Sequence, residues 1–173
     1  GDGDRIVLSD NAGTIFSGDD ILYTLASRNK MIGKAQSDMV VGTAMSNQGV
    51  VEALGKLGIS FIRTDVGDKY ISRELVKNDL NLGAEPSGHV IQREFSESGD
   101  ANIALIQTLA ALQELDTSIA EIKKWKFPVN SLCQKISSID EIETNHAKIE
   151  TLRGNLNYDV DGIVYKVNNL NFQ

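Results

Sequence analysis

The sequence has little cysteine, little proline and no long apolar run among its 173 residues. Its single cysteine, Cys133, excludes an internal disulfide and fits a reducing compartment. No apolar stretch approaches the roughly 20 residues of a membrane span, and the opening "GDGDR" leads us to expect no signal peptide. We therefore expect a cytoplasmic protein without a membrane partner.

Positive charge is also scarce, because 17 Lys and Arg residues stand against 24 Asp and Glu residues. No basic run is visible, and this balance argues against nucleic acid as a partner. The hydrophobic content of 41% is ordinary for a globular protein. Such a chain can form one or two small domains, each with a modest core.

Strand-like and helix-like segments alternate along the first two thirds of the chain. Extended segments are predicted at residues 6–18 (with a turn at 11–13), 38–46, 60–67 and 88–96, and helices at 19–29, 47–58, 68–79 and 100–115. This alternation predicts an α/β fold, with helices layered on a mixed, partly parallel sheet.

Local signals mark the ends of the helices and the residues of the core. Ser17 with Asp20 predicts a capping box before the first helix, and Gly58 predicts the end of the second. The expected core is supplied by six apolar side chains: Leu25, Val41, Leu54, Leu57, Ile106 and Leu109.

The chain is predicted to have four parts. Residues 1–18 form the edge of a preceding domain, 19–120 the α/β domain, 121–130 a connection and 131–173 a small C-terminal helix–strand unit. A strand at 162–167 needs neighbours for its backbone groups. It would dock on the first unit, add to the sheet of that unit, pair between two chains as a homodimer, or remain loose.

The helix of the last part is expected at residues 139–153. Ser138 with Glu141 predicts a capping box at its start, and Gly154 ends it. Its apolar side chains at helical spacing share one face: Ile142, Ile149 and Leu152.

The opening "GDGDR" contains chemistry that suits a metal and a phosphate. Asp2 and Asp4 are two positions apart, so both carboxylates can turn toward one point on an extended loop. Hard oxygen ligands of this kind suit Mg²⁺, and the planar fork of Arg5 fits a phosphate. The alternative is an exposed acidic terminus.

Five motifs follow one another in order over about residues 1–120. They read "GDGDR", "GTAMSNQG", "RTDVGDKYI", "GAEPSGHVI" and "SESGDANIALIQTLAAL". The set resembles the α-D-phosphohexomutases, whose patterns are D-G-D-x-D-R, G-T-x-M-S-N-x-G, R-x-x-V-G-D-R-Y-V, G-x-E-x-S-G-H and T-G-D-G. The second pattern is most typical of phosphoglucosamine mutases. The resemblance implies a fold like the third domain of that family.

The resemblance also implies a role for several side chains. Asp2 and Asp4 would hold Mg²⁺, and Arg5 would stand beside the phosphoryl group. Glu85 and Ser87 would bind hydroxyls of a sugar phosphate.

His89 would lie close to these groups as a polar contact or proton shuttle. The turn at Gly67, Asp68 and Lys69 would meet the ligand with backbone N–H groups and one charge. Two alternatives stay open, namely that Asp68 only caps the next helix and that His89 is only a packed histidine.

The sequence departs from the family pattern at two positions and lacks several parts. Pro86 stands where the family carries Gln, Asn or Met, and Ala101 replaces a common glycine. The phosphoserine, the fourth-domain phosphate loop and the first aspartate of the metal loop are not among the 173 residues. No catalytic set is therefore complete, with Arg5, Lys69 and His89 as supporting residues, and we expect no turnover from these residues alone.

The segment "FPVNSLCQKISSIDEIETNHAKIETLRGNLNYDVDGIVYKVN" resembles a second family, the bacterial NAD-dependent DNA ligases. By that resemblance Asp161 and Gly162 belong to a nucleotidyltransferase motif of the adenylation domain. Lys166 would point at the AMP phosphate. The alternative is a solvent-facing lysine that deters edge pairing. The lysine that takes AMP in that family is absent from the sequence.

The function expected first is that of a phosphoglucosamine mutase-like fragment. Such enzymes interconvert hexosamine 6-phosphate and 1-phosphate, and the fragment would bind sugar phosphate and Mg²⁺ through a partial site. Two alternatives are a nucleotide-binding remnant of a DNA ligase and a folded chimera without activity.

Overall fold

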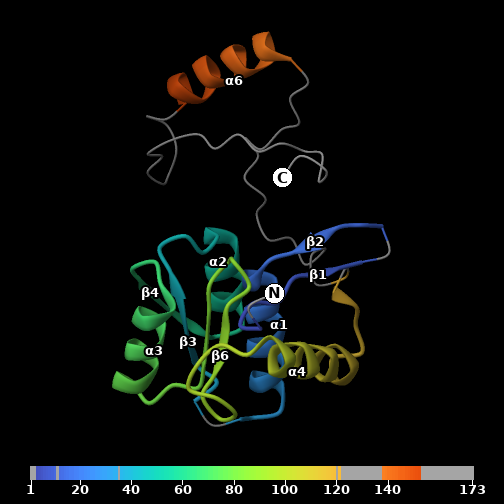
Figure 1. The fold of residues 1–173 in the computed structure, drawn as a ribbon, viewed down its shortest axis with the longest axis vertical. Helices are drawn as coiled ribbons and strands as arrows, with labels where there is room; N and C mark the ends of the chain where they lie inside the picture. The colour runs from blue at the N-terminus through green and yellow to red at the C-terminus, as the bar shows by residue number, and fades with distance from the viewer. Residues whose placement is uncertain (1–2, 11, 35, 120, 122–137, 153–173) are drawn as a thin grey trace. The chain divides into compact units, whose positions relative to one another are not determined.

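The computed structural model describes residues 3–10, 12–34, 36–119, 121 and 138–152. The chain divides into two compact units, Gly1–Val129 and Asn130–Gln173, and each is described by itself (Figure 1).

The first unit is built on a four-stranded sheet. Its strands are β3 (Met39–Thr43), β4 (Ser60–Thr64), β5 (Leu82–Ala84) and β6 (Val90–Gln92), in the order β4-β3-β5-β6. Strand β3 pairs in parallel with β4 and β5, whereas β6 is antiparallel to β5. Helix α2 (Gln48–Lys56) connects β3 to β4, and α3 (Asp68–Lys77) connects β4 to β5. The predicted α/β fold with a mixed sheet is confirmed.

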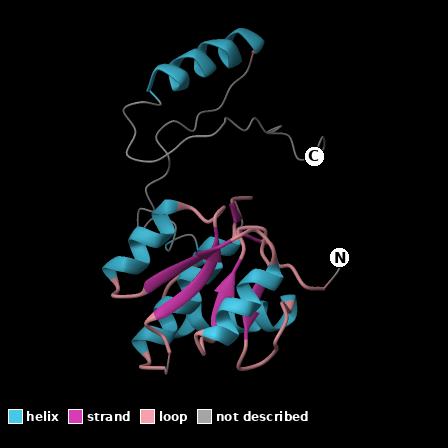
Figure 2. Ribbon diagram, turned by 90° about the vertical axis from the view of Figure 1, so that its left-hand side faces the viewer, coloured by secondary structure: helices cyan, strands magenta, loops and turns pink. Residues whose placement is uncertain are grey.

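Helices cover both faces of this sheet, as Figure 2 shows. Helix α1 (Gly18–Met31) contacts α2, β5 and α4 (Ala101–Glu114), while α3 packs on β3, β4 and β5. Successive residues of β3 supply the two cores, because side chains alternate along a strand. Val40 joins the core that contains Leu25 and Leu54, and Val41 joins the core that contains Ile71.

The predicted start of the first helix and the predicted end of the second are confirmed. The Oδ2 atom of Asp20 accepts from the Ser17 N–H at 2.7 Å and from the Ser17 hydroxyl at 2.9 Å, so the box closes before α1. Gly58 follows α2 with φ +71, a conformation that glycine adopts at low cost.

The prediction of the core is wrong for three of its six residues. Leu25, Val41 and Leu54 are buried, but Leu57, Ile106 and Leu109 are 37%, 63% and 56% exposed. Helix α4 turns a face of small side chains toward α1, with Ala104, Thr108 and Ala111 buried. Small residues let two helices approach closely, and Leu112 also packs against this core, whereas Leu105, Ile106 and Leu109 remain exposed.

Two further strands precede α1. Strands β1 (Leu8–Ser9) and β2 (Ile15–Phe16) form an antiparallel hairpin within residues 6–18, where the sequence predicts two extended pieces and a turn. The Oδ1 atom of Asp10 accepts from the N–H groups of Ala12 and Thr14 and so shapes the turn.

In the second unit the structure describes helix α6 (Ile139–Leu152). The Ser138 hydroxyl oxygen accepts from the Glu141 N–H at 3.2 Å, as the predicted cap requires. Ile149 is buried, and Ile142 and Leu152 are half-buried on the same face. The predicted connection apart from residue 121, and the predicted strand at 162–167, lie outside the described residues. None of the described helices is long and apolar enough to cross a membrane.

Candidate sugar-phosphate site

Those predicted site residues of the first unit that the structure describes lie around the carboxyl ends of the parallel strands. The loop after β4 contains Gly67, and the hairpin between β5 and β6 contains Glu85, Ser87 and His89. In open α/β sheets this edge is where ligands bind. The two strands flank β3, so their loops are separated only by the loop that follows β3.

The acidic loop at the start of the chain is joined to this hairpin through backbone contacts. Arg5 and His89 form an antiparallel bridge, and the Ile6 N–H donates to the Gly88 carbonyl at 3.0 Å. Gly88 has φ +95, and a Cβ there would lie 2.1 Å from the Ile6 carbonyl oxygen. Only glycine fits this position, so the motif glycine fastens the Asp4 loop beside the predicted sugar loop.

His89 lies between two carboxylates, those of Asp4 and Asp68, and these three side chains form the acidic cluster. The His89 side chain is buried, with Nδ1 3.4 Å from Asp4 Oδ2 and Nε2 3.9 Å from Asp68 Oδ2. Within the described part of the chain Nε2 makes no hydrogen bond. A packed histidine was one alternative. The structure shows it packed, and between two carboxylates.

Glu85 is held by two donors from different loops. Its Oε1 accepts from the Gly67 N–H at 2.9 Å, and its Oε2 accepts from the Ser87 hydroxyl at 3.0 Å. A carboxylate can accept about four hydrogen bonds, so Glu85 retains acceptor capacity for ligand hydroxyls. Ser87 is exposed. Because its hydroxyl donates a hydrogen bond to Glu85, its oxygen remains able to accept one from a ligand.

The turn after β4 differs from the expectation in two ways. The N–H groups of Gly67 and Lys69 donate to Glu85 and to Asp68 Oδ1, so neither is aimed at a ligand. Gly67, with φ 132, is the N-cap of α3, and Asp68 is the first helical residue. The alternative that Asp68 caps this helix is therefore wrong. The Lys69 ammonium lies 4.8 Å from the centre of the Tyr70 ring.

The described residues supply only part of a metal site. Asp4 Oδ1 is buried without a hydrogen-bond partner among them, and Arg5 Nε lies 3.9 Å away. An unsatisfied carboxylate oxygen fits a cation ligand. Asp2 lies outside the described residues, and the part of the chain that is described contains no group of three potential metal ligands.

The two departures from the family pattern keep useful backbone contacts. The Pro86 carbonyl accepts from the Gly18 N–H at 3.0 Å, which ties the sugar loop to the start of α1. The Ala101 N–H donates to the Gly3 carbonyl at 3.0 Å, which ties the acidic loop to the start of α4. Asp100 caps α4 by accepting from two backbone N–H groups.

Two residues that sequence reasoning did not single out hold the central loop, residues 44–47. The buried Asp19 accepts from the Asn47 N–H, and Arg63 donates to the carbonyls of Thr43 and Ser46. Asn47 lies in the second motif and Arg63 in the third. The hydrogen bonds from Asn47 to Asp19 and from Arg63 to Thr43 and Ser46 join positions too far apart in sequence to be predicted from motif spacing.

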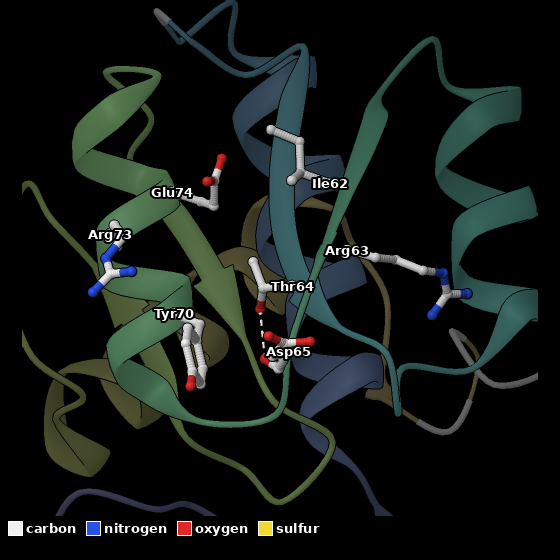
Figure 3. A pocket seen from close by; sticks show the side chains of 7 residues that line it. All are labelled: Ile62, Arg63, Thr64, Asp65, Tyr70, Arg73 and Glu74. Atoms are coloured by element: carbon white, nitrogen blue, oxygen red, sulfur yellow. Dashed lines mark hydrogen bonds between the residues drawn. The ribbon is translucent and has the colours of Figure 1, made fainter.

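A separate hollow of about 350 Å³ lies between β4 and α3. Figure 3 shows Tyr70, Arg73 and Glu74 on the helix, with Thr64 and Asp65 on the strand side, whereas Arg63 points away toward α2. None of the predicted site residues in the described ranges lines this hollow.

Residues 17–128 match the model of the phosphoglucomutase/phosphomannomutase family, alpha/beta/alpha domain III. The chain belongs to this family. The match covers all four strands of the sheet and helices α1 to α4.

The curated relatives of this phosphohexomutase domain are longer proteins. The phosphoglucosamine mutase of Hahella chejuensis is 41% identical over 157 residues, which cover 90% of this chain and 35% of that protein. That of Psychrobacter cryohalolentis is 45% identical over 122 residues, covering 70% and 26%. The chain thus spans about a third or less of the length of these relatives.

Solved structures share the fold of the phosphohexomutase domain. A structure assigned as a phosphomannomutase from Thermus thermophilus has a TM-score of 0.64 and 26% identity, covering 72% of this chain and 28% of that one. The N-acetylglucosamine-phosphate mutase in its substrate complex has a TM-score of 0.60 and 17% identity, covering 90% and 40%. The second similarity shows the fold alone.

The end of the chain matches a second family model. Residues 102–173 match the NAD-dependent DNA ligase adenylation domain, over less than half of the chain. The predicted nucleotide-contacting residues Asp161, Gly162 and Lys166 lie outside the described residues.

Proposed function

We propose that the first unit is the sugar-binding part of a phosphoglucosamine mutase-like enzyme and that it binds a hexosamine phosphate. The reaction of the whole enzyme would be the interconversion of hexosamine 6-phosphate and 1-phosphate. The observation that carries the proposal is the hydrogen bond from Gly67 to Glu85, which joins two separate motif loops at one sheet edge.

In this proposal the acceptors of the site select the hydroxyls of the sugar. Glu85 and the Ser87 oxygen accept from neighbouring hydroxyl groups, and His89 contacts the same ligand or moves a proton. A hydrogen bond to an ionised carboxylate is stronger than one between two neutral groups. A ligand would shield these acceptors from water, and a shielded acceptor without a donor is costly, so a ligand that lacks these hydroxyls would bind poorly.

Charges around this acceptor set would handle the phosphate and the metal. Arg5 offers a planar donor fork to the phosphate, and Lys69 offers a second cation. Asp2 and Asp4 would hold Mg²⁺, which neutralises charge on a transferring phosphoryl group when it is bound. The unsatisfied Oδ1 of Asp4 supports this assignment.

Isothermal titration of the full chain with glucosamine 6-phosphate and Mg²⁺ tests the proposal. Glu85→Gln keeps the size of the side chain but removes its charge and the acceptor for Ser87. We expect it to weaken binding about tenfold or more. Glu52→Gln, an exposed position on α2, is the matched control and should bind like the wild type. Absence of binding heat in the wild type would refute the proposal.

The ligase-like match supports a second candidate, a nucleotide contact at Asp161, Gly162 and Lys166. A lysine on a strand could present its ammonium to the phosphate of AMP. Titration with NAD⁺ should then give binding that Lys166→Ala removes and that Glu52→Gln preserves. Covalent labelling from radioactive NAD⁺ is not expected, so a labelled band lost in Lys166→Ala would contradict the mechanism assumed here.

A homodimer through residues 162–167 remains a further proposal. A lone strand needs a partner for its backbone groups, and its β-branched residues favour a strand. Light scattering of the full chain and of a chain ending at residue 130 should then give masses of a dimer and a monomer. Equal oligomeric states for the two chains would exclude it.

A further inference from the structure

The first turn of α1 lies between two loops of the candidate site. The Gly18 N–H donates to the Pro86 carbonyl, and a Cβ on Gly18 would lie only 1.9 Å from the Glu85 carbonyl oxygen. The next residue, Asp19, accepts from the Asn47 N–H at 2.8 Å through Oδ2. One helix end therefore contacts both the sugar loop and the loop of residues 44–47.

Burying the Asp19 carboxylate at this position costs free energy. It is only 6% exposed, and Oδ1 has no hydrogen-bond partner in the described part of the chain. Burial of a carboxylate disfavours its charged form, and burial accordingly raises the pKa of Asp19 despite the hydrogen bond from Asn47. The cap of α1 does not require it, because Ser17 and Asp20 form that cap.

Arg63 holds the same loop from the side of β4. Its Nη1 donates to the carbonyls of Thr43 at 3.2 Å and Ser46 at 2.9 Å, and its Nη2 donates to Gln48 Oε1 at 2.9 Å. In Figure 3 its side chain points away from the hollow beside α3, toward α2. The rigid fork of an arginine suits such a set of acceptors better than a lysine would.

The loop that these residues hold occupies the middle of the site. Strand β3 lies between β4 and β5, so residues 44–47 leave the sheet between the loops that Gly67 and Glu85 join. The Ala44 N–H donates to the Thr64 carbonyl at 2.8 Å, which fixes the start of the loop. Its next side chain, Met45, is 69% exposed although it is apolar.

We infer that Asp19 and Arg63 are positioning residues that fix residues 44–47 as a third wall of the sugar-phosphate site, beside the loops that contain Gly67 and Glu85. The inference rests on the proposed function for the ligand, but the anchoring of the loop is independent of it. Asp19 fixes the end of the wall, Arg63 fixes its carbonyls, and Met45 presents an apolar surface to the C–H face of a bound sugar.

Methyl NMR of methionine in the full chain tests both parts. Met45 reports on the wall, and Met31, exposed at the end of α1, is the internal control. In the absence of ligand, Asp19→Ala should shift the Met45 methyl signal and leave Met31 in place. Asp19→Asn should restore the wild-type position, because the amide oxygen can still accept from Asn47.

Titration with glucosamine 6-phosphate and Mg²⁺ tests the wall itself. The ligand should shift Met45 and not Met31 in the wild type, and Asp19→Ala should weaken binding about fivefold, the effect of one lost hydrogen bond. Arg63→Ala, at an exposed position, should act in the same direction and covers the case in which Asp19→Ala fails to fold.

The outcomes separate the two claims. An unmoved Met45 signal in both Asp19→Ala and Arg63→Ala overturns the anchoring. A moved signal together with wild-type affinity overturns the wall. If the wild type binds no sugar phosphate, the proposed function and the wall fail together, and the ligand-free spectra still decide the anchoring.

Discussion

The imidazole of His89 lies directly against the backbone of Gly99. A Cβ at position 99 would be 2.4 Å from His89 Nε2, closer than side chains tolerate. The glycine of the fifth motif therefore makes room for the histidine of the fourth. His89 in turn lies beside Asp4 and Asp68, so the packing at Gly99 sets the position of the acidic cluster.

Gly99→Ala should displace His89 and destabilise the first unit by about 1–3 kcal/mol, the usual cost of overpacking. Urea unfolding measures this change. Gly55→Ala, on α2 with open space around it, is the matched control. It should be stabilising by about 0.5–1 kcal/mol, because alanine is the better helix former. Equal effects of the two substitutions would contradict the close contact with His89.

Gly88→Ala should release the acidic loop from the sheet. The new Cβ would meet the Ile6 carbonyl oxygen at 2.1 Å, and the residue would also keep a strained φ of +95. Gly13→Ala shares the strain, with φ +78 and nothing within 4 Å. Amide hydrogen exchange at Ile6 should therefore accelerate in Gly88→Ala and stay unchanged in Gly13→Ala. Wild-type protection of Ile6 in Gly88→Ala would disprove the pairing.

Asp19→Asn should change how stability depends on pH. Burial raises the pKa of Asp19 above its ordinary 3.8, so the folded chain holds this proton more tightly than the unfolded chain. Its contribution to the free energy of unfolding is present in acid and is lost as the pH rises through the raised pKa. The asparagine variant should gain stability relative to the wild type over this rise.

Urea unfolding between about pH 4 and pH 7 measures that difference. The pKa values of Glu74 and Glu114 are lowered by hydrogen bonds from Lys77 and Arg28. Their contributions have the opposite sign, being lost as the pH falls, but they are common to both proteins and cancel. A difference that does not vary with pH would show that Asp19 keeps its ordinary pKa.

Ile106→Ala on α4 should cost little, because its side chain is mostly exposed. Exposed substitutions usually change stability by no more than about 0.5 kcal/mol. Leu25→Ala, on the buried face of α1, should cost about 2–5 kcal/mol. Comparable losses for the two variants in thermal or urea unfolding would mean that the large side chains of α4 are covered in solution.

The sequence predicted those features that depend on neighbouring residues. Alternation gave the helices and most strands, and the capping box at Ser17 and Asp20 has its partners three positions apart. Strand β5 was missed because Leu82–Ala84 is three residues long and contains a glycine. The inward face of α4 was misjudged because helix propensity and hydrophobicity do not reveal that its small side chains face α1.

The candidate site was predictable only through the order of its motifs. Glu85, Ser87 and His89 were singled out by resemblance, and the structure brings their loop beside Asp4. The hydrogen bonds from Gly67 to Glu85 and from Asn47 to Asp19 join distant segments. Such contacts depend on the order of strands in the sheet, which local patterns do not specify.

The bridge between Arg5 and His89 closes a loop of chain that contains strands β3, β4 and β5. Closing a long loop costs chain entropy, so this bridge should form after the sheet during folding and open before it during unfolding. Weakening it would accelerate release of the acidic segment with little effect on the folding rate. Fraying at this bridge would separate Asp4 from His89 while the core that contains Val41 and Ile71 remains intact.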